Sequence, residues 1–161
     1  MSQLMQSHDY IVGHLTTSIV LYEPSFEGWL SAVFYVYTNK LQDDESLQLI
    51  AHDCYIPSLI AQATSVATDA DNAERVLIKL HKLLGRSGMR NILWGFLSEK
   101  AHIGTTLFQV VKYAIDYPSR SIMEDLGNLN VLELVQTVKS VSREKHRMEA
   151  FVRFEHTTDN I

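Results

Sequence analysis

TSIVLYEPSFEGWLSAVFYVYTN, residues 17–39, is the stretch that decides the fold class. Its first six residues are apolar or β-branched, which predicts a strand that ends at Glu23-Pro24. An N-cap oxygen, an acid in the first turn and apolar residues at helical spacing follow, at Ser25, at Glu27 and from Phe26 to Tyr37. The stretch therefore predicts a strand followed at once by an amphipathic helix that ends near Asn39.

The remainder of the chain is mainly helical in its spacing. Apolar stripes predict four helices, at residues 69–84, 87–97, 101–117 and 129–149. Gly85 ends the first of them, Pro118 ends the third, and Asn128 caps the fourth. Residues 151–155 alternate apolar and polar side chains, which predicts an exposed-face strand. Residues 47–57 fit either a short helix or an irregular packed segment, and a short strand is expected near 65–67. The expected fold is α+β, a mainly helical domain with a few short strands, one before the first long helix and one after the last.

Length and composition favour a single globular domain. A chain of 161 residues buries roughly 70% of the surface that its unfolded form exposes. With 46% hydrophobic and 20% charged residues, the sequence is too apolar to be disordered. Residues 1–16 show no sustained period and are expected to be a lead-in or an extension, whereas residues 17–161 are expected to form one α+β domain.

Several classes of site lack support in the sequence. Cys54 is the single cysteine, so neither an intrachain disulfide nor a cysteine-based metal cluster is expected. His52-Asp53-Cys54 brings three metal-binding residue types together, but adjacent residues do not share one face of a helix or strand. Phosphate-binding glycine loops and a G-x-S-x-G elbow are absent from the sequence. We therefore expect no metal and no cofactor.

The sequence also indicates a location. Its first residues lack the basic and apolar regions of a secretion signal, and no stretch approaches the roughly 18 apolar residues that cross a bilayer. A lone cysteine suits a reducing compartment. We expect a cytoplasmic protein with no membrane partner.

Charge is unevenly distributed along the chain. The formal net charge is −5, yet residues 1–60 carry seven acidic side chains against Lys40 alone, and the remaining residues carry thirteen bases and twelve acids. An acidic protein does not coat nucleic acid nonspecifically, but one cationic face can still make local phosphate contacts. Ordinary variation of a solvated surface explains the same distribution equally well.

Basic residues gather in SREKHRMEAFVRF, residues 142–154, and just before it. Lys139, Arg143 and Arg147 recur every four residues, which stacks them on one face of the expected helix at a rise of about 6 Å per step. Phosphates of a nucleic acid strand are natural ligands for such a row. The candidate nucleic-acid-binding residues are Lys139, Arg143, His146, Arg147 and Arg153, with Phe151 or Phe154 as a stacking ring. The alternative is that the row is the solvated face of an amphipathic helix and both phenylalanines are core.

The sequence offers only weak candidates for catalysis. His146 is a candidate acid–base group, with Glu144 or Glu27 as its partner. A histidine near a helix C-terminus more often satisfies the helix dipole, and capping explains an acid such as Glu27 in a first turn. The sequence does not settle whether the chain is an enzyme.

Three segments together resemble a known family. They are YEPSFEGWLSAVFYVY (22–37), AERVL with MRNILWGFLSE (73–77 and 89–99), and VSREKHRMEAFVRF (141–154). They are similar, in the same order, to the bacterial probable DNA metabolism proteins, a domain of unknown function linked to a seven-cysteine radical-SAM protein and sometimes fused to a uracil-DNA-glycosylase-like domain. The positions that match the family's recurrent residues are Phe26, Glu27, Gly28, Phe96, Leu97, Ser98, Glu99, Glu144, His146, Arg147, Phe151, Arg153 and Phe154. Ala150 departs from the expected glycine.

The resemblance implies a role beside the radical-SAM partner. It implies an accessory nucleic-acid-binding or adaptor domain in DNA repair or modification, with DNA and the radical-SAM protein as partners. The alternatives are an enzyme acting on a nucleobase or nucleotide, and a purely protein-binding scaffold that docks through the acidic residues 1–60. Because members of the family continue past the position of Ile161, the resemblance also implies that the chain is shortened at its C-terminus.

Overall fold

The computed structural model describes residues 16–118 and 121–158, with side chains described as far as Ala150. The chain divides into two compact units, residues 1–82 and 83–161. The expected lead-in, residues 1–16, lies outside the described residues except for Thr16. The expectation of a single domain over 17–161 stays a prediction.

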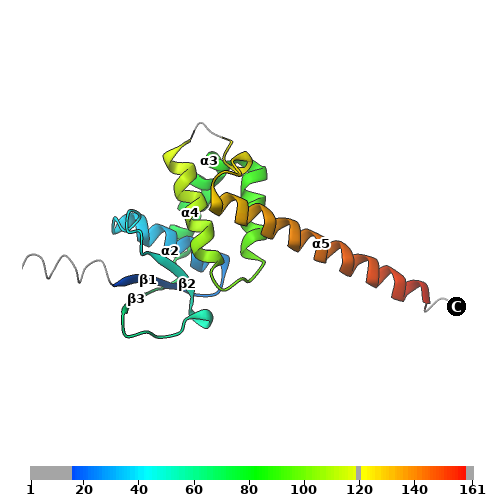
Figure 1. Cartoon of the computed structure of the whole chain (residues 1–161), viewed down its shortest axis with the longest axis horizontal. Coiled ribbons are helices and arrows are strands. Elements are labelled where there is room, and N and C mark those ends of the chain that lie inside the picture. The colour runs from blue at the N-terminus through cyan, green and yellow to red at the C-terminus, as the bar shows by residue number, and fades with distance from the viewer. Residues whose placement is uncertain (1–15, 119–120, 159–161) are drawn as a thin grey trace, which may run out of the picture. The chain divides into compact units, whose positions relative to one another are not determined.

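A three-stranded parallel sheet organises the first unit (Figure 1). Its strands are β1 (Thr17–Tyr22), β2 (Gln48–Ala51) and β3 (Ala61–Val66), in the order β2-β1-β3. Val20 of β1 lies opposite Leu49 of β2 and Thr64 of β3. Central strands of parallel sheets are covered on both faces, which explains why the apolar run of β1 does not alternate. Its last four residues are only 2–7% exposed.

Helix α2 (Phe26–Thr38) follows β1 directly and packs on the sheet. Its first turn is capped as expected, because Ser25 Oγ accepts a hydrogen bond of 3.0 Å from the backbone N–H of Gly28. Trp29 and Val36 are completely buried. The strand and helix expected from residues 17–39 are confirmed.

The ambiguous segment 47–57 forms β2 and the short 3₁₀ helix η1 (His52–Cys54). Leu49 is completely buried in β2, although the strand has only four residues. Local periodicity could not identify this strand, because its stabilisation comes from pairing with β1, which lies more than twenty residues earlier in the chain.

Helix α3 (Ala70–Phe96) contains the break that the sequence indicated at Gly85. Its N-terminus is capped by Asp69, whose Oδ1 accepts from the N–H of Asn72 at 2.9 Å. Gly85 has φ 69° and ψ −177°, a conformation that L side chains rarely adopt. The two helices expected on either side of Gly85 are therefore present, joined through this one non-helical residue.

The second unit is helical and packs around α4 (Ile103–Asp116) and α5 (Leu129–Thr158), with the 3₁₀ helix η2 (Ile122–Glu124) between them in the chain. Its core contains side chains that are fully buried, among them Ile92, Leu107, Phe108, Val111, Val131 and Leu134. Gly95 lets α3 approach α5 closely, since a Cβ there would lie 2.4 Å from Leu134 Cδ1. Lys100 Nζ also donates to the buried hydroxyl of Thr137 at 2.8 Å.

The strand expected at 151–155 is wrong, because α5 continues as a helix to Thr158. No glycine or proline interrupts residues 129–158. Extending an existing helix adds one hydrogen bond per residue, whereas a strand needs a neighbouring strand to pair with. Met148 falls at helical spacing on the side of α5 that carries Val131 and Leu134, which predicts burial, but it is 64% exposed.

The fold class is confirmed as α+β, with strands before and between helices rather than after the last one. None of the described helices combines the length and the apolar composition that crossing a membrane requires.

Candidate nucleic-acid interface

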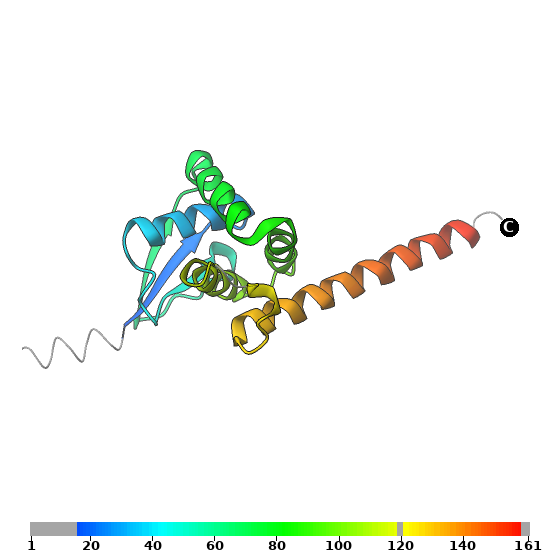
Figure 2. The same ribbon diagram turned by 90° about the horizontal axis from the view of Figure 1, so that it is seen from above.

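Helix α5 carries most of the residues that the sequence singled out. Its N-terminus is fixed by Asn128, whose Oδ1 accepts from the N–H groups of Asn130 and Val131 at 3.0 and 3.2 Å. The last buried residue of the helix is Thr137, Val141 and Ser142 are half-buried, and every residue from Arg143 to Ala150 is exposed. Figures 1 and 2 both draw the last turns of α5 with no other element of the same unit alongside.

Lys139, Arg143 and Arg147 form one row on this helix, which we call the basic stripe. Because an α-helix turns about 100° per residue, successive members are rotated by only about 40° and rise by about 6 Å. All three side chains are exposed. Among the described residues, none of the three lies within ion-pair distance of a carboxylate. The stripe is therefore available to an external anion.

His146 lies on the same side of α5 as the basic stripe, by the same helical rotation. Its Nδ1 is 3.8 Å from Glu149 Oε2, and the two side chains are 77% and 52% exposed. An exposed pair at this separation contributes little free energy. Glu144 lies three residues before Arg147, about 60° of rotation from it, and borders the stripe on that side. The two glutamates flank the stripe and reduce its positive potential without pairing to it.

Arg153 was expected on a strand but lies in the final turns of α5. Phe151 and Phe154, the expected stacking rings, lie in the same turns. The side chains of these three residues lie outside the described part of the chain. Their roles stay predictions.

Sequence reasoning missed a second cationic group, which we call the Trp94 cluster: Arg90, Trp94 and Lys145. Arg90 Cζ lies 5.4 Å from the centre of the Trp94 ring, and Lys145 Nζ lies 5.3 Å from it. Both distances fall within the range of cation–π attraction. The four-residue spacing of Arg90 and Trp94 on one helix was visible in the sequence. The approach of Lys145 from α5 was not, because it depends on how two helices pack.

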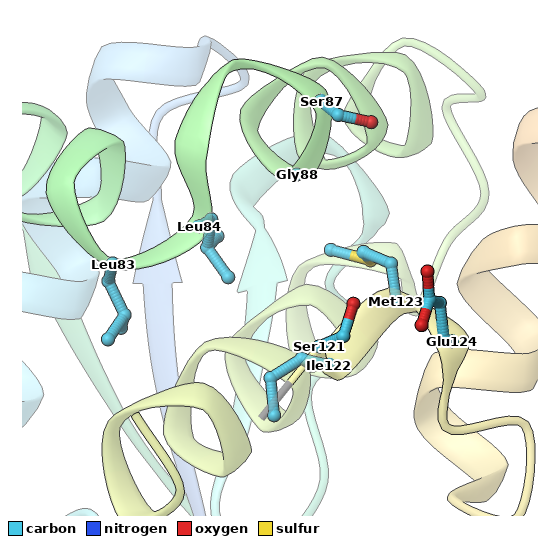
Figure 3. A pocket seen from close by; sticks show the side chains of 8 residues that line it. All are labelled: Leu83, Leu84, Ser87, Gly88, Ser121, Ile122, Met123 and Glu124. Carbon is cyan, nitrogen blue, oxygen red and sulfur yellow. The ribbon is translucent and has the colours of Figure 1, made fainter. Parts of the chain in front are cut away.

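The catalytic candidates do not converge on a described cavity. A pocket of about 340 Å³ lies between α3 and η2 in the second unit (Figure 3). Its walls are formed by Leu83, Leu84, Ser87, Gly88, Ser121, Ile122, Met123 and Glu124. None of His146, Glu144 and Glu27 lines it. The Glu124 carboxylate would repel a phosphate, so we do not assign the pocket to nucleic acid.

Glu27 belongs to the first unit and is exposed in the first turn of α2. An acid at this position interacts favourably with the helix dipole. The helix dipole and the capped first turn therefore account for Glu27.

The His52-Asp53-Cys54 segment forms η1, and all three residues are exposed. Desolvation and the neighbouring Asp53 carboxylate raise the pKa of the Cys54 thiol. Since the thiolate is the form that binds metals and attacks substrates, a raised pKa disfavours both roles for Cys54. No group of three metal-binding side chains occurs within the described parts of the chain.

One region of the chain matches a family model in the comparison with known proteins. A family model described as a domain of unknown function (DUF4130) matches residues 101–161. The match covers α4 and α5 and includes the basic stripe, but its description names no activity. Searches of curated proteins and of solved structures found no match.

Proposed function

We propose that this protein is an accessory nucleic-acid-binding domain and that the basic stripe of α5 contacts the phosphate backbone. The observation that carries the proposal is the row of three exposed cations without a carboxylate partner among the described residues. Phosphate contacts of this kind position a protein on nucleic acid without reading its sequence. Each contact releases counterions, so binding must weaken as salt is added.

The distribution of charge supports a binding surface on the second unit. Residues 1–82 carry ten acidic and four basic side chains, whereas residues 83–161 carry nine acidic and ten basic ones. The first unit therefore repels a polyanion, and the second does not. Contact through the second unit alone would give a modest affinity, as suits an accessory domain that acts beside another protein.

The resemblance to the probable DNA metabolism proteins supports a narrower version of the proposal. In that version the ligand is DNA, the process is DNA repair or modification, and the chain works with a radical-SAM protein. The family model that matches residues 101–161 supports the presence of this domain, and its description names no ligand or partner.

Fluorescence anisotropy with labelled single-stranded and duplex DNA over a salt series tests the proposal. The test variant replaces Lys139, Arg143 and Arg147 by glutamine, which removes the charge and keeps good helix propensity. If each cation contacts one phosphate of a single strand, the slope of log affinity against log salt becomes less negative by about 2.

A matched control removes three cations elsewhere. Arg75, Lys79 and Lys82 are exposed on the part of α3 that belongs to the first unit, and their replacement by glutamine changes the net charge by the same amount. We expect this control to bind DNA as the original protein does. Equal losses from both triple variants would show that only total charge matters, and undetectable binding of the original protein would refute the proposal.

A second candidate function, a protein-binding scaffold, has an observation of its own. Ile56, Leu59 and Ile60 are 84%, 106% and 70% exposed in the segment before β3. Such a group of exposed apolar side chains is typical of an interaction surface. Co-purification with the radical-SAM protein that survives nuclease treatment, and is lost when all three residues become serine, would favour the scaffold. Loss of co-purification on nuclease treatment would favour the DNA-mediated function.

A further inference from the structure

The Trp94 cluster has the composition of a site for a single nucleotide. Arg90 and Lys145 come from two helices and reach the same indole ring, so their charged groups lie at most about 11 Å apart. Neither cation has an ion pair with a described carboxylate. The positive charge around the ring is therefore not neutralised within the described protein, and both side chains are exposed to an incoming anion.

The ring itself supplies a different kind of contact. Trp94 is only partly buried, unlike Trp29, which is completely buried in the first unit. Nucleobases stack on partly exposed aromatic side chains in proteins that bind single strands, and nearby cations bind the phosphates. Duplex bases are already stacked on one another and do not offer a free face to the indole.

We infer that the Trp94 cluster binds one unpaired nucleotide, with the base on the indole and the adjoining phosphate between Arg90 and Lys145. This inference rests on the proposed function and adds a preference for single-stranded over duplex nucleic acid. On binding, the two cations move from the ring to the phosphate, and the base takes their place on the indole.

The two tryptophans make this binding directly measurable. The chain contains only Trp29 and Trp94, and the buried Trp29 provides a constant background. Titration with unlabelled oligodeoxythymidine of about 12 nucleotides, within the usual size of single-strand sites, should quench the Trp94 emission with the same midpoint as the binding curve from anisotropy. The Trp94→Phe variant defines the background and should show no quenching.

Removal of the ring should lower the affinity for a single strand and leave duplex binding unchanged. For Trp94→Ala we expect at least about a fivefold loss for oligodeoxythymidine, in line with the known effect of losing one stacked base. The double variant Arg90→Gln with Lys145→Gln keeps the ring and should lose affinity by a similar factor. It replaces Trp94→Ala in the test if circular dichroism shows that Trp94→Ala is unfolded.

A control comes from the same helix. Arg86 is exposed on α3, one turn before Arg90, and is not placed over the ring. Arg86→Gln should weaken single-strand binding by a clearly smaller factor than the double variant, because it removes one nearby charge and no contact with the ring. An equal loss from Arg86→Gln and from the Arg90 and Lys145 double variant would overturn the inference.

The outcomes separate the inference from the function on which it rests. If single strands and duplexes bind equally and Trp94 is not quenched, the nucleotide site is refuted while binding through the basic stripe stands. If neither nucleic acid binds, the proposed function fails and the nucleotide site fails with it. A single-strand preference that disappears in Trp94→Ala or in the double variant supports the site.

Discussion

The two halves of α5 have similar backbone geometry but different environments. In the first half, Val131 and Leu134 are completely buried and Thr137 is 1% exposed, whereas every residue from Arg143 to Ala150 is exposed. Packing stabilises the first half, while the second, apart from the contact of Lys145 with Trp94, depends on helix propensity and on continuity with the first. The comparison shows that one helix can both complete a core and present a surface, because burial declines from Thr137 to Ser142 and is absent from Arg143 to Ala150.

The largest difference between the halves is expected in amide hydrogen exchange. Opening of residues 131–141 requires loss of the core of the second unit, whereas residues 143–150 can open locally. We expect the opening free energies to differ by about 5 kcal/mol or more, since the packed half should approach the stability of the whole domain. Equal protection in the two halves, measured by mass spectrometry on peptides from each, would mean that another surface covers the second half.

A core substitution in the first half should strongly destabilise the protein. Leu134 is completely buried, and its Cδ1 lies against the position of Gly95. Leu134→Ala should lower the free energy of unfolding by about 3 kcal/mol, through lost burial and the cavity that remains. Urea denaturation measures this change, and an unaltered m-value would show that the unfolded state is unaffected. A loss below about 1 kcal/mol would contradict the packing described.

Gly95→Ala tests the close contact of α3 with α5. The added Cβ would lie 2.4 Å from Leu134 Cδ1 and 3.1 Å from Leu107 Cδ2. Overpacking of this kind costs about 1–3 kcal/mol, although the better helix propensity of alanine offsets part of it. We expect a net loss of about 1 kcal/mol in the same denaturation experiment. With Leu134→Ala already present, the loss from Gly95→Ala should shrink or change sign, because the side chain that it meets is gone.

The smallest effect is expected in the exposed half. Met148 is 64% exposed, so Met148→Ala should change the free energy of unfolding by less than about 0.5 kcal/mol. This variant is the exposed-half counterpart of Leu134→Ala, since both shorten an apolar side chain of α5. If Met148→Ala were as destabilising as Leu134→Ala, a partner or a second copy would have to cover Met148 in solution, which analytical ultracentrifugation would detect.

Local signals in the sequence were sufficient for much of the fold. Ser25, Asp69 and Asn128 cap the helices that follow them, and Gly85 interrupts α3, because capping and the left-handed conformation depend on a few adjacent residues. Non-local features were missed. Strand β2 exists because β1 pairs with it, whereas the alternating residues 151–155 continue helix α5.

Only part of the candidate site was predictable from the sequence. The basic stripe follows from a four-residue spacing on a single helix, so the sequence was enough to place Lys139, Arg143 and Arg147 on one face. The Trp94 cluster joins residues about fifty positions apart, and no spacing rule connects Arg90 to Lys145.

The sequence by itself determined where the described helices begin and break, the position of the first strand, the segregation of charge, and the alignment of the basic stripe. Only the tertiary structure decided which face of α5 is covered, where that cover ends, which short segments pair into the sheet, and that two cations share one indole ring. The physical reason is the range of the interactions. Caps, turns and helical periodicity act over a few residues, whereas burial and strand pairing depend on groups that the folded chain brings together.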